Sequence, residues 1–242
     1  MQQIPLENLF LIDIETVSEK EDFRLLDDTW KELWTEKISK SLPQDATAEE
    51  YYPLRAAIFA EFAKVVCISF GYFKKENNEW QLRIKSLYSE KEEEILNPFI
   101  ATMKQLHSNK QWVFTGHNIK EFDVPFLCRR MLKNGITIPT YIDFQNMKPW
   151  ETPVLDTLHL WRFGDYKHYT SLKLLAAVLG VPSPKDDIDG SQVGHVFWKE
   201  KDLNRISIYC EKDVATVANI ILRFKGLPLL REEQMVFVDR VR

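Results

Sequence analysis

The feature that most constrains the fold of this chain is a short apolar run that ends in two acids. Residues 8–14 read Asn-Leu-Phe-Leu-Ile-Asp-Ile, and Glu15 follows directly. A run of this length is typical of a buried β-strand and is too short to span a membrane as a helix. Because alternate residues of a strand share one face, Asp13 and Glu15 are presented together at the strand's end. Two such carboxylates repel each other and favour a bound divalent cation, although a solvated strand end is the simpler explanation of the pair alone.

Further along the chain, strand patterns alternate with helix patterns, which is typical of an α/β domain. The predicted strands are 8–14, 64–73, 80–88, 111–115 and 154–158. The predicted helical regions are 18–60, 89–107, 124–134, 171–179 and 203–225. Capping boxes at Thr47/Glu50 and Ser89/Glu92 mark two helix starts. We expect one domain over residues 1–242, with 18–60 as a helical insertion and 227–242 as a tail to which the pattern assigns no element.

Composition and charge exclude several classes of protein. The 242 residues carry a formal net charge of −4, which excludes a chain that holds nucleic acid by bulk positive charge but not a metal-loaded nuclease. At 45% hydrophobic and 28% charged residues, the chain has the balance of a folded globule. The three cysteines are widely spaced, which indicates neither a disulfide framework nor a zinc site. We therefore expect a soluble, cytoplasmic protein with no membrane partner.

Two further motifs place acids where they could join the first pair. Within residues 116–127, Asn118 fits a turn and Asp123 fits the N-cap of the following helix, so capping alone would explain this acid. In the last helix, Tyr209 and Asp213 are four residues apart and share a face at the flank of the apolar stripe. A partly exposed pair on an amphipathic helix would explain that spacing equally well.

Together and in this order, the three motifs resemble the DEDD superfamily of 3′→5′ exonucleases, in its tyrosine branch, DEDDy. The stretch Asn118-x3-Phe122-Asp123, followed by Val-Pro-Phe-Leu, is especially similar to the proofreading exonuclease domain of B-family DNA polymerases. The histidine branch would carry a histidine at position 208, where this chain has isoleucine. The resemblance covers most of residues 8–225 and includes the stand-alone, polymerase-B-like predicted exonucleases of bacteria.

The resemblance implies a ribonuclease H-like α/β fold, with a mixed five-stranded sheet flanked by helices. It also implies two Mg²⁺ or Mn²⁺ ions and a catalytic set of Asp13, Glu15, Asp123, Tyr209 and Asp213, in which the four carboxylates are metal ligands. Asp13 would bridge both ions. Glu15 and Asp213 would hold the ion that activates water, and Asp123 would support the ion at the leaving group. Tyr209 would orient the attacking water, because a phenol with a pKa near about 10 is a poor base at neutral pH.

Substrate-binding residues are predicted in two places. Asn118 could hydrogen-bond a terminal nucleotide or brace its own turn, and Phe122 is either a core residue or a base-stacking side chain. Residues 161–173 combine four aromatic side chains with basic ones, among them Lys167 and Lys173, and such a combination is typical of single-strand binding. We hypothesise that this segment contacts the substrate strand; a loop whose aromatics pack on the domain is the alternative.

The predicted function is a metal-dependent 3′→5′ exonuclease that hydrolyses phosphodiester bonds from the 3′ end of single-stranded DNA. An RNA-trimming exoribonuclease is the first alternative, because contacts that read the 2′-OH are not visible in a sequence. An inactive nucleic-acid-binding or scaffold subunit is the second, and the presence of all four acids argues against it. A proofreading role would require a polymerase or repair partner in trans.

Overall fold

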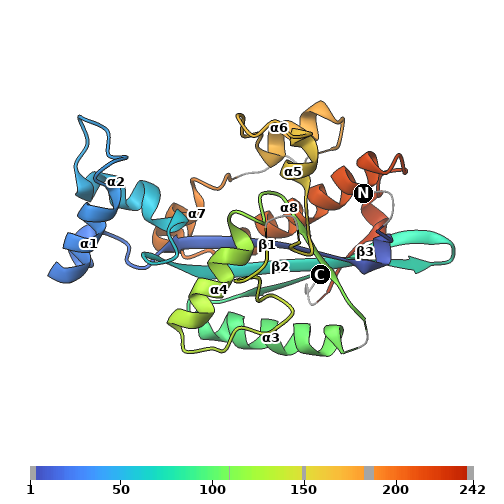
Figure 1. The fold of residues 1–242 in the computed structure, drawn as a ribbon, viewed down its shortest axis with the longest axis horizontal. Coiled ribbons are helices and arrows are strands. Elements are labelled where there is room, and N and C mark those ends of the chain that lie inside the picture. Colours follow the sequence, from blue (N-terminus) through green and yellow to red (C-terminus); the bar gives the residue numbers. More distant parts are fainter. Residues whose placement is uncertain (1–3, 109, 149–150, 183–187, 239–242) are drawn as a thin grey trace.

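A computed structural model of the chain describes residues 4–108, 110–148, 151–182 and 188–238. At its centre lies a mixed six-stranded sheet in the order β5–β4–β1–β2–β3–β6 (Figure 1). The strands are β1 (Leu9–Ser18), β2 (Ala63–Glu76), β3 (Glu79–Tyr88), β4 (Val113–Gly116), β5 (Val154–Asp156) and β6 (Met235–Phe237). β1, β2 and β3 form the antiparallel meander that the sequence predicts, while β4, β5 and β6 pair in parallel with their neighbours.

Helices cover both faces of the sheet, with α3 and α4 on one face and α8 on the other (Figure 1). The α-helices are α1 (Asp28–Ile38), α2 (Ala48–Arg55), α3 (Glu93–His107), α4 (Asp123–Lys133), α5 (Thr157–Arg162), α6 (Leu172–Val178), α7 (Val193–His195) and α8 (Leu203–Phe224). Shorter 3-10 turns are Leu6–Asn8, Phe23–Leu25, Ala56–Ile58 and Glu232–Gln234, and a π-helical turn, Val196–Glu200, follows α7. None of the helices in the described ranges is long and apolar enough to cross a bilayer.

The alternation of side chains along β1 decides which core each of them enters. Ile12 and Ile14 enter the core beneath α3 and α4, whereas Leu11 enters the core beneath α8. Asp13 and Glu15 continue the series of Leu11, so the strand directs both carboxylates to the face on which α8 lies. The alternation of apolar side chains along β1 thus determines the face of the sheet on which Asp13 and Glu15 lie.

Two predictions about the sheet need correction. The sheet has six strands instead of five, because residues 235–237 of the tail pair in parallel with β3. Three residues are too few for their alternation to be recognised in a sequence. β1 also continues to Ser18, because it stays paired with β2 beyond the irregularity at Glu15 and Thr16. Asp13 and Glu15 therefore lie inside a strand and not at its end.

The region 18–60 carries α1 and α2, which project from one end of the sheet (Figure 1). They pack around a small core of their own, in which the buried rings of Trp34 and Tyr52 lie 5.2 Å apart. The predicted capping box at the start of α2 is present: Glu50 N donates to the Thr47 hydroxyl oxygen at 3.2 Å, and Thr47 N donates to the Glu50 carboxylate at 3.0 Å. Local capping and a shared core together support two short helices.

The second predicted capping box, at Ser89 and Glu92, does not form. Ser89 Oγ donates instead to the Glu94 carboxylate at 2.8 Å. The Glu92 carboxylate is buried against the Arg130 guanidinium of α4, with N–O distances of 2.7 and 2.8 Å. A buried, bidentate pair with arginine is stronger than a cap exposed to water, so the long-range contact prevails over the local motif.

Candidate active site

Asp123, from the motif within residues 116–127, contacts the strand that carries Asp13 and Glu15. It begins α4, but the N-cap is Phe122 and carries no side-chain capping bond, so the predicted capping role of Asp123 is wrong. Its buried carboxylate accepts instead from the backbone N–H of Ile14 at 3.1 Å. β4 pairs with β1 only over Leu9–Leu11, so the N–H of Ile14 lies beyond that ladder and needs another acceptor. The Asp123 carboxylate supplies it, which brings this acid between Asp13 and Glu15.

The turn that leads to Asp123 is held by another acid, Asp156, at the end of β5. The Asp156 carboxylate accepts from the backbone N–H groups of Asn118 at 3.0 Å and Lys120 at 3.1 Å. Asn118 has a left-handed backbone conformation, with φ of 61°, which such a tight turn requires. Gly116 leaves no room for a side chain, because a Cβ would lie 2.9 Å from a carbonyl oxygen of β1. Asp156 therefore has a structural role in holding this turn.

The third motif lies on α8, which packs across β1, β2 and β3. Tyr209 and Asp213 are one helical turn apart, and their side chains are hydrogen-bonded. Between them, Cys210 faces β1, and its Sγ donates to the Asp13 carboxylate at 3.2 Å. Three motifs that are far apart in the sequence therefore meet at one place on the sheet.

Burial and like charge dominate the electrostatics of this cluster. Burial, followed by repulsion from Asp213 and Asp123, raises the pKa of Asp13 well above its usual value. Burial, followed by repulsion from Asp13, does the same to the pKa of Glu15. Burial raises the pKa of Asp123 to about 7, although the backbone hydrogen bond from β1 opposes this shift. The neighbours that raise these pKa values are acids and thiols, so a bound cation would reduce the repulsion among the carboxylates.

The phenol of Tyr209 remains protonated beside these acids. Burial, followed by repulsion from Asp213 and Glu15, raises its pKa far above the ordinary value. A protonated phenol can donate to a carboxylate and accept from water, but it cannot take a proton at neutral pH. A protonated phenol beside Asp213 is suited to holding a water molecule, and the orienting role of Tyr209 stays a prediction.

The donor atoms of the cluster suit hard divalent cations. One oxygen each of Asp13 and Glu15 and the Sγ of Cys210 lie within 4.8 Å of one another. Asp123 and Asp213 are close enough to repel these acids. Carboxylate oxygens are the ligands that Mg²⁺ and Mn²⁺ prefer, whereas the Cys210 thiol keeps its proton because burial raises its pKa. The set therefore fits oxygen-binding cations better than zinc.

A cleft of about 430 Å³ opens beside the cluster. It is lined by Asp13, His117, Tyr169, Ser171, Leu172, Lys173, Ile188, Asp189, Gln192, Tyr209, Asp213 and Thr216. The walls come from the α5–α6 connection on one side and from residues 188–192 on the other. The wall formed by residues 188–192 continues into α7, and residues 183–187 before it lie outside the described ranges.

The predicted substrate-binding residues have different surroundings. Lys173 lines the cleft, whereas Lys167 is exposed on the α5–α6 connection. Phe122 is half-buried against the core, with its ring centroid 5.2 Å from that of Phe126. The Oδ1 atom of Asn118 is buried without a hydrogen-bond partner in the part of the chain that the structure describes. Only Lys173 among these side chains lines the cleft beside the acids.

His117 lies in the cleft wall, and its role was not visible in the sequence. Its Nε2 lies 2.9 Å from the Thr170 carbonyl oxygen, and its Nδ1 lies 2.9 Å from the Thr157 hydroxyl. Burial lowers its pKa, so the ring is neutral at pH 7. A carbonyl can only accept, so Nε2 carries the proton and Nδ1 is an acceptor; the single Thr157 hydroxyl proton is shared between Nδ1 and the Gly116 carbonyl oxygen, which lies 3.2 Å from that hydroxyl. A single histidine in a turn gives no local signal of such long-range partners.

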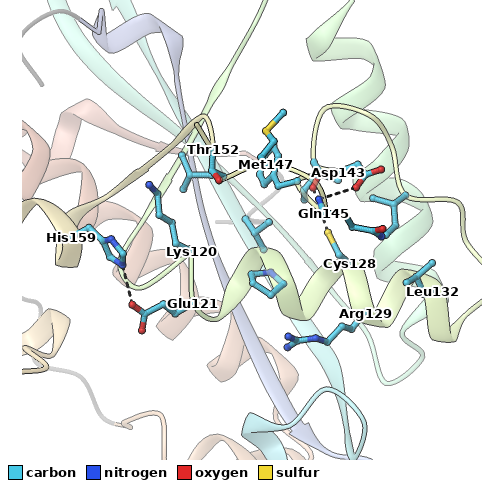
Figure 2. A pocket seen from close by; sticks show the side chains of 16 residues that line it. Lys120, Glu121, Cys128, Arg129, Leu132, Asp143, Gln145, Met147, Thr152 and His159 are labelled. Carbon is cyan, nitrogen blue, oxygen red and sulfur yellow. Dashed lines mark hydrogen bonds and ion pairs between the residues drawn. The ribbon is translucent and has the colours of Figure 1, made fainter. Parts of the chain in front are cut away.

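A second pocket, of about 540 Å³, lies between the outer side of α4 and residues 138–147 and 152–154 (Figure 2). Its wall is largely apolar, with Cys128, Leu132 and Met147 among the lining residues. The described lining contains none of the four predicted metal ligands. The cleft is lined by Asp13 and Asp213 and lies beside the buried acids with raised pKa values, which makes it the candidate active site although this pocket is larger.

The fold is ribonuclease H-like α/β, with a mixed six-stranded sheet flanked by helices. Among solved structures, the chain is similar to the family B DNA polymerase from the hyperthermophilic archaeon Pyrobaculum calidifontis, with a TM-score of 0.56 and 16% sequence identity. The similarity covers 91% of this chain and 24% of that polymerase chain. At this level of identity the comparison establishes the fold.

A family model described as a predicted 3′→5′ exonuclease related to the exonuclease domain of PolB matches residues 58–233. The match covers more than half of the chain, and the chain therefore belongs to this family of predicted exonucleases. This confirms the resemblance that the motifs indicated. Asp123, Tyr209 and Asp213 lie inside the matched range, whereas Asp13 and Glu15 precede it. No curated protein matches the chain.

Proposed function

We propose that this chain is a metal-dependent 3′→5′ exonuclease that hydrolyses phosphodiester bonds from the 3′ end of single-stranded DNA. One observation carries the proposal: acids from three separate motifs gather beside one cleft, with Tyr209 among them. Buried acids that repel one another cost stability, and such perturbed groups cluster at functional sites. Membership of a family of predicted exonucleases supports the reaction class.

Asp13, Glu15, Asp123 and Asp213 would hold two divalent cations, Mg²⁺ or Mn²⁺. When bound, such ions lower the pKa of the attacking water and stabilise negative charge on the phosphate and the leaving oxygen. The protein contributes the placement of the ligands. The β1 backbone holds the Asp123 carboxylate, and the Cys210 thiol holds that of Asp13, so both side chains are oriented in advance.

Tyr209 would hold the attacking water in line with the scissile phosphate. Its hydroxyl group donates to the Asp213 carboxylate, which leaves the oxygen lone pairs available to a water molecule. Asn118, Phe122, Lys167 and Lys173 are the proposed contacts to the substrate. Lys173 is placed in the cleft, where it can meet a phosphate of the bound strand.

DNA is the proposed substrate because the family is described as related to the PolB exonuclease domain and the similar solved structure is a DNA polymerase. The experiment that tests the proposal uses 5′-labelled single-stranded DNA and RNA of matched sequence, incubated with Mn²⁺, Mg²⁺ or EDTA. We expect a ladder that shortens from the 3′ end, requires the metal and is absent for Asp13→Ala. Asp143→Ala removes an exposed acid from the other pocket and should leave the rate unchanged.

The possible results separate the alternatives. Faster shortening of RNA than of DNA would reassign the substrate to RNA and keep the reaction. No product from either strand, in a folded protein that also releases no heat when titrated with Mn²⁺, would contradict the proposal and leave a binding module.

A further inference from the structure

The connection between α5 and α6 exposes three aromatic rings within seven residues. Phe163, Tyr166 and Tyr169 are 89%, 70% and 63% exposed. We call residues 163–169 the aromatic arm. The neighbouring Trp161 does not belong to it, because its ring packs against the cluster between α6 and α8. A single exposed ring needs no explanation, but a contiguous group beside a catalytic cleft marks an interaction surface.

The aromatic arm is continuous with the cleft. Tyr169 lines the cleft and meets the His117 ring edge to face, with the centroids 6.4 Å apart. Tyr166 lies above α5, with its ring 6.3 Å from that of His159 and 5.8 Å from the guanidinium carbon of Arg162. The most exposed ring, Phe163, is at the other end of the arm. A strand that leaves the cleft past Tyr169 would therefore meet further aromatic faces.

The backbone at Phe163 has an unusual conformation. It ends α5 with φ of 46°, in the left-handed region that bulky side chains rarely adopt, and Gly164 follows with φ of 90°. Burial of the ring does not compensate this strain, because the ring is almost fully exposed. A left-handed residue commonly ends a helix, but a phenylalanine in this conformation is strained, and strained backbone conformations cluster at functional sites.

His117 fixes the inner end of the arm to the catalytic turn. Its ring nitrogens contact Thr170, directly after the arm, and Thr157, at the start of α5. His117 immediately precedes Asn118 in the turn that leads to Asp123. Its contacts therefore fix the position of the arm relative to the acids. Glu121 of the same turn accepts from Arg162 at 2.9 Å, which adds a second link.

The charge around the arm suits a polyanion. Residues 161–173 contain three lysine or arginine side chains and one aspartate, in a chain whose formal net charge is −4. Aromatic faces combined with cations bind single strands without regard to sequence, since every base can stack and every phosphate attracts a cation. A purely apolar partner would not require this surplus of positive charge.

We propose that the aromatic arm is a base-stacking platform for single-stranded nucleic acid, and that His117 is the positioning residue that holds it beside the cleft. The inference rests on the proposed function and deepens it: the arm binds the strand upstream of its 3′ end while the acids act on the terminal bond.

The first test measures binding in EDTA, where no cleavage occurs. A fluorescent oligothymidylate of about 15 nucleotides exceeds one typical single-strand site, and its anisotropy reports the dissociation constant. The double variant Phe163→Ala/Tyr166→Ala should weaken binding by about tenfold or more. Leu54→Ala removes a side chain that is 73% exposed on α2, far along the sheet, and should bind like the wild type. Unchanged affinity of the double variant would overturn the proposal, including the case in which the arm binds a protein.

The second test separates the arm from the acids. The p-nitrophenyl ester of thymidine 5′-monophosphate has no upstream bases, so the double variant should cleave it with Mn²⁺ as fast as the wild type does. On the long oligonucleotide the KM should rise while kcat is kept. His117→Ala should weaken binding of the oligonucleotide in EDTA as the double variant does, and His117→Gln, which can still donate to Thr170, should recover part of that affinity. Equal losses of activity on the ester and on the oligonucleotide would show that the substituted side chains have only a structural role, and would overturn the proposal. A wild-type protein that binds strands through the arm but cleaves neither substrate would support the arm and contradict the proposed function.

Discussion

Two buried clusters of charge in this molecule are built in opposite ways. In the first, which links α3 and α4, the Glu92 carboxylate and the Arg130 guanidinium neutralise each other, and both side chains are buried. Their remaining hydrogen-bonding groups are also satisfied: Arg130 donates to the Ala60 carbonyl at 2.8 Å, and Glu92 accepts from Val65 N at 2.8 Å. This cluster joins the helices to the sheet and to the end of the region 18–60.

The second cluster contains Asp13, Glu15 and Asp123, whose charges have the same sign and raise one another's pKa values. Here the surrounding structure holds the acids in place but does not neutralise them. The comparison teaches that burial of charge has two uses. A compensated pair connects elements of the fold, whereas uncompensated acids hold their protons more tightly, lose them when a cation binds, and reduce stability while they are charged and no cation is bound.

The largest effect should follow from neutralising one acid of the second cluster. Asp13→Asn keeps the shape of the side chain but removes a ligand and a charge. We expect nuclease activity to fall at least about a thousandfold, or ~4 kcal/mol of transition-state stabilisation. The melting temperature in EDTA should rise, because one repelling charge is gone. Initial rates on labelled DNA and thermal melts measure the two quantities, and a lower melting temperature would contradict the comparison.

Breaking the compensated pair should have the opposite signature. Arg130→Met leaves the Glu92 carboxylate buried without its partner, and we expect the free energy of unfolding to fall by about 3–5 kcal/mol. Urea unfolding measures this loss. Arg129→Met, at the neighbouring exposed position, should change stability by no more than about 0.5 kcal/mol. Similar losses for both variants would show that the Glu92–Arg130 pair has no special role.

The acid cluster also predicts how stability depends on pH. The pKa of Asp123 is about 7 in the folded protein and 3.8 ordinarily, so the folded state binds this proton more tightly than the unfolded chain does. Binding of this proton therefore stabilises the folded state fully below about pH 4, and the stabilisation is lost as the pH rises through 7. We expect the melting temperature in EDTA to fall by roughly 5 °C or more between about pH 5 and pH 8.

Divalent metal should reverse this loss. Mn²⁺ competes with protons for the same carboxylates, so it should raise the melting temperature at about pH 8 and have little effect near pH 5. Melting curves with Mn²⁺ and with EDTA across this range provide the measurement. If the difference in melting temperature between Mn²⁺ and EDTA did not change with pH, the metal would bind elsewhere than at the acids whose pKa values are raised.

The smallest effect should come from Tyr209, which carries no charge. Tyr209→Phe removes only the hydroxyl group, and a hydrogen bond to a charged group is worth about 1.5–3 kcal/mol, so we expect a loss of roughly tenfold to a hundredfold in rate. Asp213→Ala should be nearly inactive, since it removes a metal ligand. Single-turnover rates with saturating Mn²⁺ compare the two, and equal residual rates would contradict the division of roles between them.

The sequence by itself determined the elements whose signals are local. The predicted strands 64–73 and 80–88 form a hairpin, and Asn77 and Asn78 make its turn with φ of 49° and 66°. The last helix, predicted over 203–225, spans Leu203–Phe224, and its N-cap Asp202 accepts from Arg205 N at 2.9 Å. Because such patterns need only neighbours within a few residues, they can be read without any knowledge of the fold.

Only the tertiary structure decided which partners the buried polar groups have. Asp123 and Glu92 both looked like parts of helix caps, yet the first binds β1 and the second binds α4. His117 contacts Thr157 and Thr170, far along the chain, and neither contact leaves a trace in the local pattern. The physical reason is common to all three. Inside the protein an unsatisfied polar group is costly and a hydrogen bond is strong, so distant partners that exclude water prevail over nearby caps that do not.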